Sequence, residues 1–442
     1  MEARRIAFET LLKIKGDEAY SNQALATAFS EHELSVKDKA MISEIVYGSL
    51  THDALLNFWL QPYFQGRVKE WVQTLLAMTL YQVVYLERIP NYAAIHEAVE
   101  IAKMRGGNFN AKIVNAILRK VTSTGLRAVD MLEDEPERLA TQYSHPVWLV
   151  RLWLAQFGQN RTSEMLKANN ERAMISLRTN LAKVNKDELS KLLASEGIVC
   201  KTGKLCPSAL LVATGNPLQT QAFEKGLFYI QDESSMLPAM ALSPPKGARV
   251  LDVCAAPGGK TLHLAEMVGE LGTVYAHDIY DHKICRTNKN AKRLGINNVE
   301  ASLLSALELG ANYEPESFDY ILVDAPCSGL GILRRHPEAK LTKKPEDLDA
   351  IIQIQKDILL SASKFLKPGG RLVYSTCTVN KKENQRQIEA FLATEENFEL
   401  DGKFEERMPN CLVKNFESGM LQLFPQDFAT DGFFIASLIK KS

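Results

Sequence analysis

Two cysteines that each follow a strand-like run are the residues of this chain best suited to chemistry. Cys327 comes soon after the apolar run 320–323, and Cys377 soon after the apolar run 371–374. A thiolate is a strong nucleophile, but a free thiol has a pKa near about 8.5, so little of it is ionised at neutral pH unless its site lowers that pKa. An isolated cysteine is usually a small buried apolar residue. The case for chemistry therefore depends on the elements around these two.

A glycine-containing motif, DVCAAPGGKT at 252–261, lies upstream of both cysteines. Gly258 and Gly259 predict a tight turn at which backbone amides of a helix N-terminus approach a ligand. Asp278 follows the next strand-like run, twenty residues after Gly258, which is the distance at which an acid meets ribose hydroxyls in dinucleotide folds. An acid at this position suits a ligand that contains adenosine.

The same motif ends like a phosphate-binding loop, because Gly259, Lys260 and Thr261 match the last residues of a Walker motif. That motif requires a glycine at position 254, where this chain has Cys254. The sequence therefore argues against a nucleotide triphosphatase.

The strands that must position these residues are predicted from four short apolar runs: 249–253, 273–277, 320–323 and 371–374. Helical patterns separate the runs, and this alternation predicts an α/β fold with a doubly wound parallel sheet. Ligands of such sheets bind beyond the carboxyl ends of the strands. Both cysteines should therefore lie above a bound cofactor, on neighbouring strands.

The rest of the chain predicts two further domains. Apolar residues recur at helical spacing from residue 6 to about 120, and the acidic stretch 133–137 is typical of a linker. Residues 141–240 mix a helical pattern with short apolar runs. We therefore expect an all-α domain at 1–140, a small α+β domain at 141–240 and the doubly wound domain at 241–442.

Composition restricts the function classes. The chain has 442 residues, 46% of them apolar, and a net charge of −1, so nucleic acid would have to bind to local basic patches. Its seven cysteines form no Cys-x-x-Cys pair or Cys/His cluster, which predicts reduced thiols and no metal site. No stretch approaches eighteen apolar residues and the N-terminus lacks a signal-peptide pattern, so we expect no membrane association and a cytoplasmic protein.

Two basic runs are candidates for such patches. Residues 101–120 carry five basic residues and no acid, and residues 333–345 carry five basic residues against Glu338 alone. In isolation, a run of this kind is more often a solvated helix face.

Taken together, the motifs resemble those of the RsmB (Sun, Fmu) family of 16S ribosomal RNA cytosine-5 methyltransferases. The resemblance rests on 229–235, 254–260, 320–328, 334–337, 371–378, 383–384 and 431–434. Segments 20–22, 38–40, 90–99 and 115–119 are similar to the RNA-binding NusB-type antitermination domain. The resemblance implies an all-α NusB-like domain, a small α+β domain and a Rossmann-like methyltransferase domain.

The resemblance also implies the roles of the reactive residues. Cys377 would add to carbon 6 of cytosine, because the RNA enzymes use the Thr-Cys position, whereas Cys327 would assist release. Chemistry alone leaves the order of the two cysteines open. Asp324 would hydrogen-bond the base at N3 and also contact the cofactor, S-adenosylmethionine. The other implied cofactor contacts are Cys254, Ala255, Ala256, Pro257, Gly258, Gly259, Lys260, Asp278 and Ser305.

The chain departs from the family pattern at two positions. Ser305 stands where an aspartate usually contacts the adenine, and Leu341 replaces a customary tryptophan. Ser305 is the one feature that favours the alternative of a non-catalytic RNA-binding assembly factor, whereas the intact Asp324 and cysteines favour an enzyme.

The implied partner is 16S ribosomal RNA, either naked or in an assembling small subunit, and the implied state is a monomer. The expected RNA contacts are Arg4, Arg5, Arg119, Lys120, Arg334, Arg335 and His336.

Overall fold

The computed structural model describes residues 2–17 and 19–442, and the chain divides into two compact units. One unit ends at Arg172 and also contains Leu333–Pro345, and the other contains Ala173–Ile332 and Glu346–Ser442. None of the helices in the described ranges is both long and apolar enough to cross a membrane.

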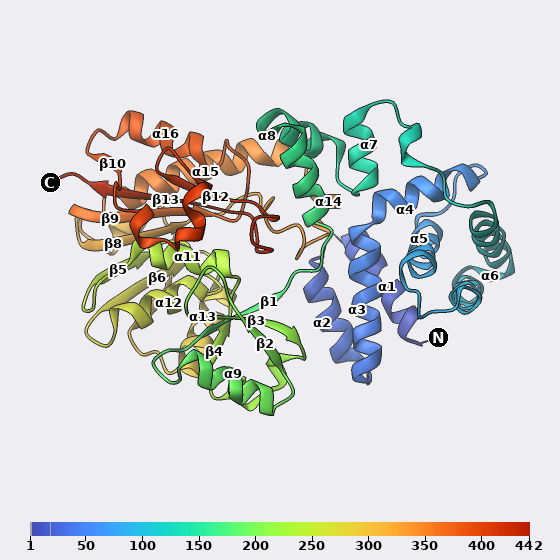
Figure 1. The fold of residues 1–442 in the computed structure, drawn as a ribbon, viewed down its shortest axis with the longest axis horizontal. Coiled ribbons are helices and arrows are strands. Elements are labelled where there is room, and N and C mark those ends of the chain that lie inside the picture. The colour runs from blue at the N-terminus through green and yellow to red at the C-terminus, as the bar shows by residue number, and fades with distance from the viewer. Residues whose placement is uncertain (1, 18) are drawn as a thin grey trace. The chain divides into compact units, whose positions relative to one another are not determined.

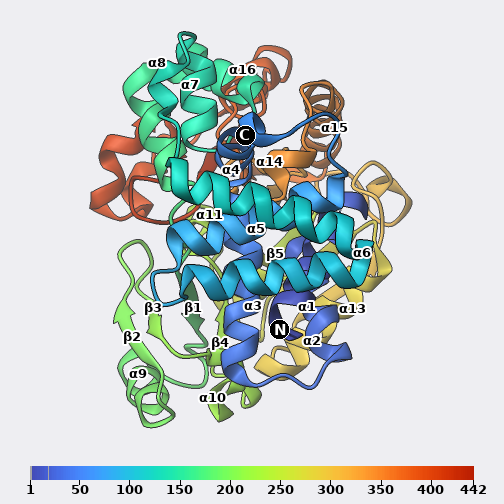
Figure 2. The same cartoon turned by 90° about the vertical axis from the view of Figure 1, so that its right-hand side faces the viewer.

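The first unit is helical and has its own apolar core. Ile6, Ile45, Leu76 and Leu118 are among the core residues that are almost fully buried. Figure 2 shows α5 and α6 lying side by side across this unit. Its helices are α1 Glu2–Asp17, α2 Ser21–Glu31, α3 Val36–Thr51, α4 Asp53–Leu60, α5 Glu70–Tyr85, α6 Asn91–Thr124, α7 Glu135–Gln142, α8 Val147–Ala168 and the short α14 Ala339–Thr342.

The second unit begins with a small antiparallel sheet, in the strand order β2-β3-β1-β4. Leu177, Leu210 and Phe228 from this sheet pack against Leu189 and Leu193 of the helix α9 (Lys186–Ser195). The strands are β1 Ile175–Thr179, β2 Val199–Thr202, β3 Ala209–Thr214 and β4 Phe228–Ile230, and the short helix α10 Gln221–Glu224 precedes β4. This α+β arrangement confirms the predicted fold class of the middle of the chain.

A larger mixed sheet forms the rest of the second unit (Figure 1). Its parallel part has the order β9-β8-β5-β6-β7. These strands are β5 Arg249–Asp252, β6 Thr273–Asp278, β7 Val299–Leu303, β8 Phe318–Asp324 and β9 Leu366–Thr376. The sheet confirms the predicted doubly wound fold.

Alternate residues of the parallel strands face two different helical layers. On one face, Ile321 and Leu372 pack with Leu359 of α15 (Glu346–Ser363) and Phe391 of α16 (Gln385–Thr394). On the other face, the sheet packs against α11 (Glu233–Leu242) and α12 (Gly259–Val268), and α13 (Asp281–Leu294) lies beside β6 and β7. Burial on both faces explains why these strands are continuous apolar runs.

The sheet is extended past β9 by antiparallel strands, which the parallel expectation did not include. β13 pairs with β9 and with β12, and β12 pairs with β11, while β10 also pairs with β13. These strands are β10 Phe398–Leu400, β11 Phe416–Glu417, β12 Met420–Leu423 and β13 Phe433–Lys440.

Candidate active site

The parallel register brings Cys327 and Cys377 together. β8 and β9 are neighbours, with Asp324 paired to Ser375 near their carboxyl ends. Each cysteine follows its strand by a few residues, and the two Sγ atoms lie 3.3 Å apart. Both thiols are free and partly buried. Two strand ends thus form a paired-thiol site.

The environment of Cys327 keeps its thiol protonated. Its hydrogen bond with Cys377, its shielding from water and the nearby Glu383 carboxylate all raise the pKa of the Cys327 thiol well above its ordinary value. A neutral thiol is a poor nucleophile but is able to donate a proton. Cys327 is therefore better suited to donate a proton than to attack.

Asp324 lies beside the thiols and is held by two donors. Lys260 donates to its Oδ2 over 2.7 Å, and the Ser375 hydroxyl donates to its Oδ1 over 2.7 Å. Although burial favours the neutral amine, the charge and hydrogen bond of Asp324 raise the pKa of Lys260, and Cys377 acts in the same direction. The site therefore contains a fixed cation that pairs with the carboxylate and interacts electrostatically with Cys377.

A buried carboxylate, Glu383, ties the two cysteine loops together. It accepts the Ser328 backbone N–H over 2.8 Å and the Ser328 hydroxyl over 2.5 Å, so it holds the residue that follows Cys327. Asn380, from the loop after Cys377, donates to Glu383 over 3.1 Å, and Gln355 of α15 donates over 3.0 Å. Charge-assisted hydrogen bonds of this kind are stronger than neutral ones, so Glu383 fixes the spacing of the thiols.

The turn after β5 has the shape of a ligand cradle. Gly258 has a φ of 97°, which favours glycine, and a Cβ there would lie 2.9 Å from Thr287. Asp278 accepts the Ala256 N–H over 3.3 Å and the Tyr280 N–H over 3.1 Å, so its carboxylate is fixed beside the turn. The small residues leave backbone groups open to close approach, which fits the adenosine and amino-acid parts of S-adenosylmethionine.

The small sheet helps to hold this cradle. Arg178 of β1 is almost fully buried, and it donates to the Gly259 carbonyl over 2.7 Å and to Glu266 of α12 over 2.9 Å. Within α12, Thr261 donates to Asp252 over 2.7 Å, and burial raises the pKa of that carboxyl to about 7. The start of α12 is thus fixed from two sides.

Ser305 lies beyond the end of β7. Its hydroxyl accepts the Leu307 N–H over 3.2 Å and its carbonyl accepts the Glu308 N–H over 2.9 Å, so it closes a turn. The side chain is partly buried. Its role in cofactor contact stays a prediction, as do the roles of Cys254, Ala255 and Pro257.

The predicted RNA contacts in α1 and α6 differ in exposure. Arg119 and Lys120 are exposed near the end of α6. Arg5 is also exposed and pairs with Glu9 over 3.1 Å. Arg4 is only 9% exposed and pairs with Glu97 over 2.7 Å, so a phosphate would have to compete with that carboxylate.

The basic run at 333–345 is not a solvated face. Arg334 is 8% exposed and Lys340 is 4% exposed. His336 lies 3.3 Å from Glu338, which also accepts the Ser21 N–H over 3.1 Å. Composition could not reveal this burial. The RNA contacts expected for Arg334, Arg335 and His336 stay predictions.

Lys340 is buried without a carboxylate partner among the described residues. It donates to the Asn170 side chain over 2.6 Å and to the Thr51 carbonyl over 3.4 Å. Burial lowers the pKa of Lys340 to about 7. His52 and His145 face it, and burial together with Lys340 lowers the pKa of both, that of His52 to about 4.

Stability should therefore rise with pH because of Lys340. Its pKa is lower in the folded chain than in the unfolded chain, so between about pH 7 and 10 the unfolded state binds more protons. We expect Lys340 to increase the free energy of unfolding across this window by up to about 4 kcal/mol. The two histidines titrate below the window.

Denaturant unfolding of wild-type chain and Lys340→Met at several pH values tests this expectation, with Lys343→Met, on the same segment, as the control. The rise should be smaller in Lys340→Met and unchanged in the control. Parallel pH curves for all three chains would show that Lys340 stays charged on folding.

The sequence analysis did not predict the contacts of three charged residues of the site. Lys260 was assigned to the cofactor turn, whereas its ammonium reaches Asp324. Glu383 was noted only as part of a family motif, and Arg178 only as part of an apolar run. Both make their key contacts with residues more than fifty positions away, so no local pattern could have identified them.

Comparisons with known proteins agree with this architecture. Residues 239–439 match the model of the 16S rRNA methyltransferase RsmB/F, residues 1–123 match the NusB family, and residues 145–219 match the ferredoxin-like domain of RsmF/B-like methyltransferases.

Whole-chain relatives give the same result. A probable ribosomal RNA small subunit methyltransferase B of Bacillus subtilis is 42% identical over 99% of this chain and 98% of its own length. Ribosomal RNA small subunit methyltransferase B of Cronobacter sakazakii is 33% identical over 95% of each chain. Among solved structures, PH0851 superposes with a TM-score of 0.85 at 26% identity, covering 99% of this chain and 98% of its own. The chain therefore belongs to the family of ribosomal RNA small subunit methyltransferase B.

Proposed function

We propose that this chain transfers the methyl group of S-adenosylmethionine to carbon 5 of a cytosine in 16S ribosomal RNA, through a covalent bond between Cys377 and the base. The observation that carries the proposal is the pair of free thiols 3.3 Å apart beside Asp324. A pyrimidine carbon is too weak a nucleophile to attack a methyl sulfonium unaided. A thiolate that adds at carbon 6 makes carbon 5 nucleophilic.

Each side chain has a defined task in this scheme. Lys260, whose pKa is raised, stabilises a thiolate on Cys377 as it forms. Asp324, fixed by Lys260 and Ser375, takes up the proton of the Cys377 thiol and donates it to cytosine N3 while charge moves into the ring. Carbon 5 takes the methyl group that S-adenosylmethionine supplies. Carbon 5 then gives its proton to water, and the bond from carbon 6 to Cys377 breaks, with its electron pair returning to Cys377 and the N3 proton returning to Asp324.

Cys327 is the group proposed to serve this last step. Its thiol is kept neutral by the hydrogen bond with Cys377 and by burial, which raise its pKa. It lies close enough to Cys377 to exchange a proton as that thiolate adds or leaves. The scheme thus gives the two cysteines different tasks.

The turn at 254–260 and Asp278 are proposed to bind S-adenosylmethionine. Support comes from the positive φ of Gly258, which shapes the turn, and from the Asp278 carboxylate that is fixed beside it. Lys260 points to Asp324 and not into a phosphate cradle, which argues further against a phosphate loop.

Bisulfite sequencing tests the reaction and identifies the target. Ribosomal RNA from cells with and without the protein is compared, and the gene carrying Cys377→Ala serves as the matched control. We expect one cytosine of 16S ribosomal RNA to be protected from deamination only in cells with the wild-type protein. Identical deamination maps in all three strains would contradict cytosine-5 methylation. Protection of the same cytosine in cells with Cys377→Ala would show that Cys377 is not the nucleophile.

A further inference from the structure

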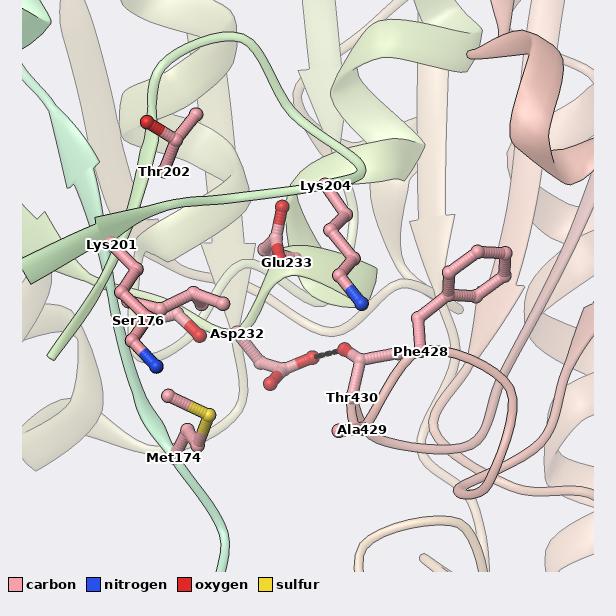
Figure 3. A pocket seen from close by; sticks show the side chains of 11 residues that line it. Met174, Ser176, Lys201, Thr202, Lys204, Asp232, Glu233, Phe428, Ala429 and Thr430 are labelled. Carbon is pink, nitrogen blue, oxygen red and sulfur yellow. Dashed lines mark hydrogen bonds between the residues drawn. The ribbon is translucent and has the colours of Figure 1, made fainter. Parts of the chain in front are cut away.

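A pocket of about 230 Å³ lies within the second unit, on the side of the small sheet. Its walls come from β2 and the turn after it, from the start of α11, and from the loop before β13 (Figure 3). Lys201 and Lys204 supply the positive groups of the wall, whereas Met174, Leu211 and Phe428 supply apolar surface. The pocket is separate from the cofactor turn, none of whose residues line it.

The two carboxylates of the pocket already accept hydrogen bonds from other residues of the protein. Asp232 caps α11 and accepts the Thr430 hydroxyl and the Asp431 N–H, the latter over 3.3 Å. Glu233 accepts the backbone N–H groups of Leu205 over 2.7 Å and of the next residue over 3.2 Å. These bonds hold the turn after β2 and the loop before β13 in place, so the pocket is built on fixed walls.

The two lysines are left available to an external anion. Both are exposed, and neither forms an ion pair with any residue that the structure describes. Figure 3 shows both side chains extending from the β2 side toward the loop that carries Thr430. Two cations beside an apolar wall suit a nucleotide, because phosphates bind the cations and the base packs on the apolar side chains.

The size and position of the pocket support the same ligand. Its volume is below the roughly 300–1,000 Å³ typical of sites for larger ligands, so one nucleotide is the matching unit. The loop from Phe428 continues to Gly432, whose N–H donates to the Gly331 carbonyl over 2.8 Å. Gly331 in turn donates to the Cys377 carbonyl over 3.0 Å. The pocket is thus connected to the candidate nucleophile through a few residues.

We propose that this pocket binds one unpaired nucleotide of the substrate RNA next to the target cytosine, with its two flanking phosphates on Lys201 and Lys204 and its base against Met174 and Leu211. The proposal rests on the proposed function, because it assigns the pocket to the same RNA substrate. By holding a neighbouring nucleotide, the pocket would fix the position of the target base over Cys377 and contribute to the choice of sequence.

Methyl transfer to an unmodified 16S RNA transcript tests the pocket in the full-length protein. The variant Lys201→Glu/Lys204→Glu is compared with Lys186→Glu/Lys191→Glu, which makes the same charge change at a half-buried and an exposed position of α9. We expect the pocket variant to raise KM for RNA by about 10- to 100-fold with kcat within threefold of wild type. Its log–log salt dependence of RNA binding should be shallower by about 1.4, the value for two single-strand phosphate contacts. The control should match wild type.

A second variant separates the base contact from charge. Met174→Ala should raise KM for RNA by about 2- to 10-fold, because it removes apolar surface on which the base packs, and should leave the salt dependence unchanged. Both effects should persist at saturating S-adenosylmethionine.

The possible outcomes distinguish failure of the pocket proposal from failure of the proposed methyl transfer. If the wild-type protein is active, equal KM values and salt slopes for the pocket variant and the control would overturn the proposed nucleotide binding. The methyltransferase proposal would then remain intact. A loss seen with assembling subunits but not with protein-free RNA would mean that the pocket binds a protein, and would also overturn it. An inactive wild type would reject the proposed function instead.

Discussion

Cys327→Ala should accumulate a covalent protein–RNA adduct. In the proposed order of steps, this variant still attacks with Cys377 and still transfers the methyl group, but it lacks the thiol that assists release. Cys327 lies 3.3 Å from Cys377, and its raised pKa keeps its proton available for that step. The adduct should appear as a slower band on a denaturing gel and disappear on treatment with ribonuclease.

Cys377→Ala should behave in the opposite way. Without the nucleophile no bond to RNA forms, so no adduct should appear, and turnover should fall by on the order of 10⁴-fold or more. Cys285→Ala is the matched control, because Cys285 is an exposed cysteine on α13. It should keep wild-type turnover and give no adduct.

The adduct experiment is able to contradict the proposal in two ways. An adduct with Cys377→Ala and none with Cys327→Ala would exchange the roles of the two cysteines. Full methylation by both variants would mean that neither thiol attacks the base. Because both variants are read on the same gel with the same RNA, a general loss of folding would remove the adduct from both variants and would not exchange the bands.

Much of the sheet was predictable because buried parallel strands leave a strong local signal. The runs 249–253, 273–277, 320–323 and 371–374 correspond to β5, β6, β8 and β9. Each is apolar over most of its length because helices cover both faces. The topology of such sheets then places the strand ends together, which is why two cysteines fifty residues apart could be expected to meet.

Helix boundaries were harder to predict where the first turn of a helix is strongly acidic. The stretch 133–137 was interpreted as a linker because it is acidic and contains proline. In the structure α7 begins at Glu135, and the Asp134 side chain accepts the Glu137 N–H over 3.2 Å. An aspartate cap, proline in the first turn and acids near the N-terminus are start signals of a helix, so the linker interpretation was wrong. The domain boundaries proposed near it remain a proposal.

Long-range burial was beyond the reach of composition. Lys340 looks like one of several lysines in a basic run, but its contact with the Thr51 carbonyl spans 289 positions in sequence. The same holds for Glu383, whose partner Ser328 is 55 positions away. Which charged residue becomes buried depends on which surfaces meet in the folded chain, and no local spacing contains that information.

Glu383 gives the second large expected effect. Glu383→Gln removes the negative charge that accepts the Ser328 N–H, the Ser328 hydroxyl and the amides of Gln355 and Asn380. The amide of the new side chain would place a donor against these donors. We expect the loops of Cys327 and Cys377 to lose their spacing and kcat to fall by about 10²- to 10³-fold, or about 3–4 kcal/mol.

A positioning role has a signature that a purely structural role lacks. Because Glu383 does not contact the cofactor turn, the Kd for S-adenosylmethionine should stay within about twofold of wild type while kcat falls. Introduced into Cys327→Ala, Glu383→Gln should also reduce adduct formation, since attack by Cys377 depends on the same loops. Glu389→Gln, on the exposed side of α16, is the matched control and should change none of these values. Wild-type turnover in Glu383→Gln would show that the thiols are positioned without this carboxylate, and a parallel loss of cofactor binding and thermal stability would assign it to stability alone.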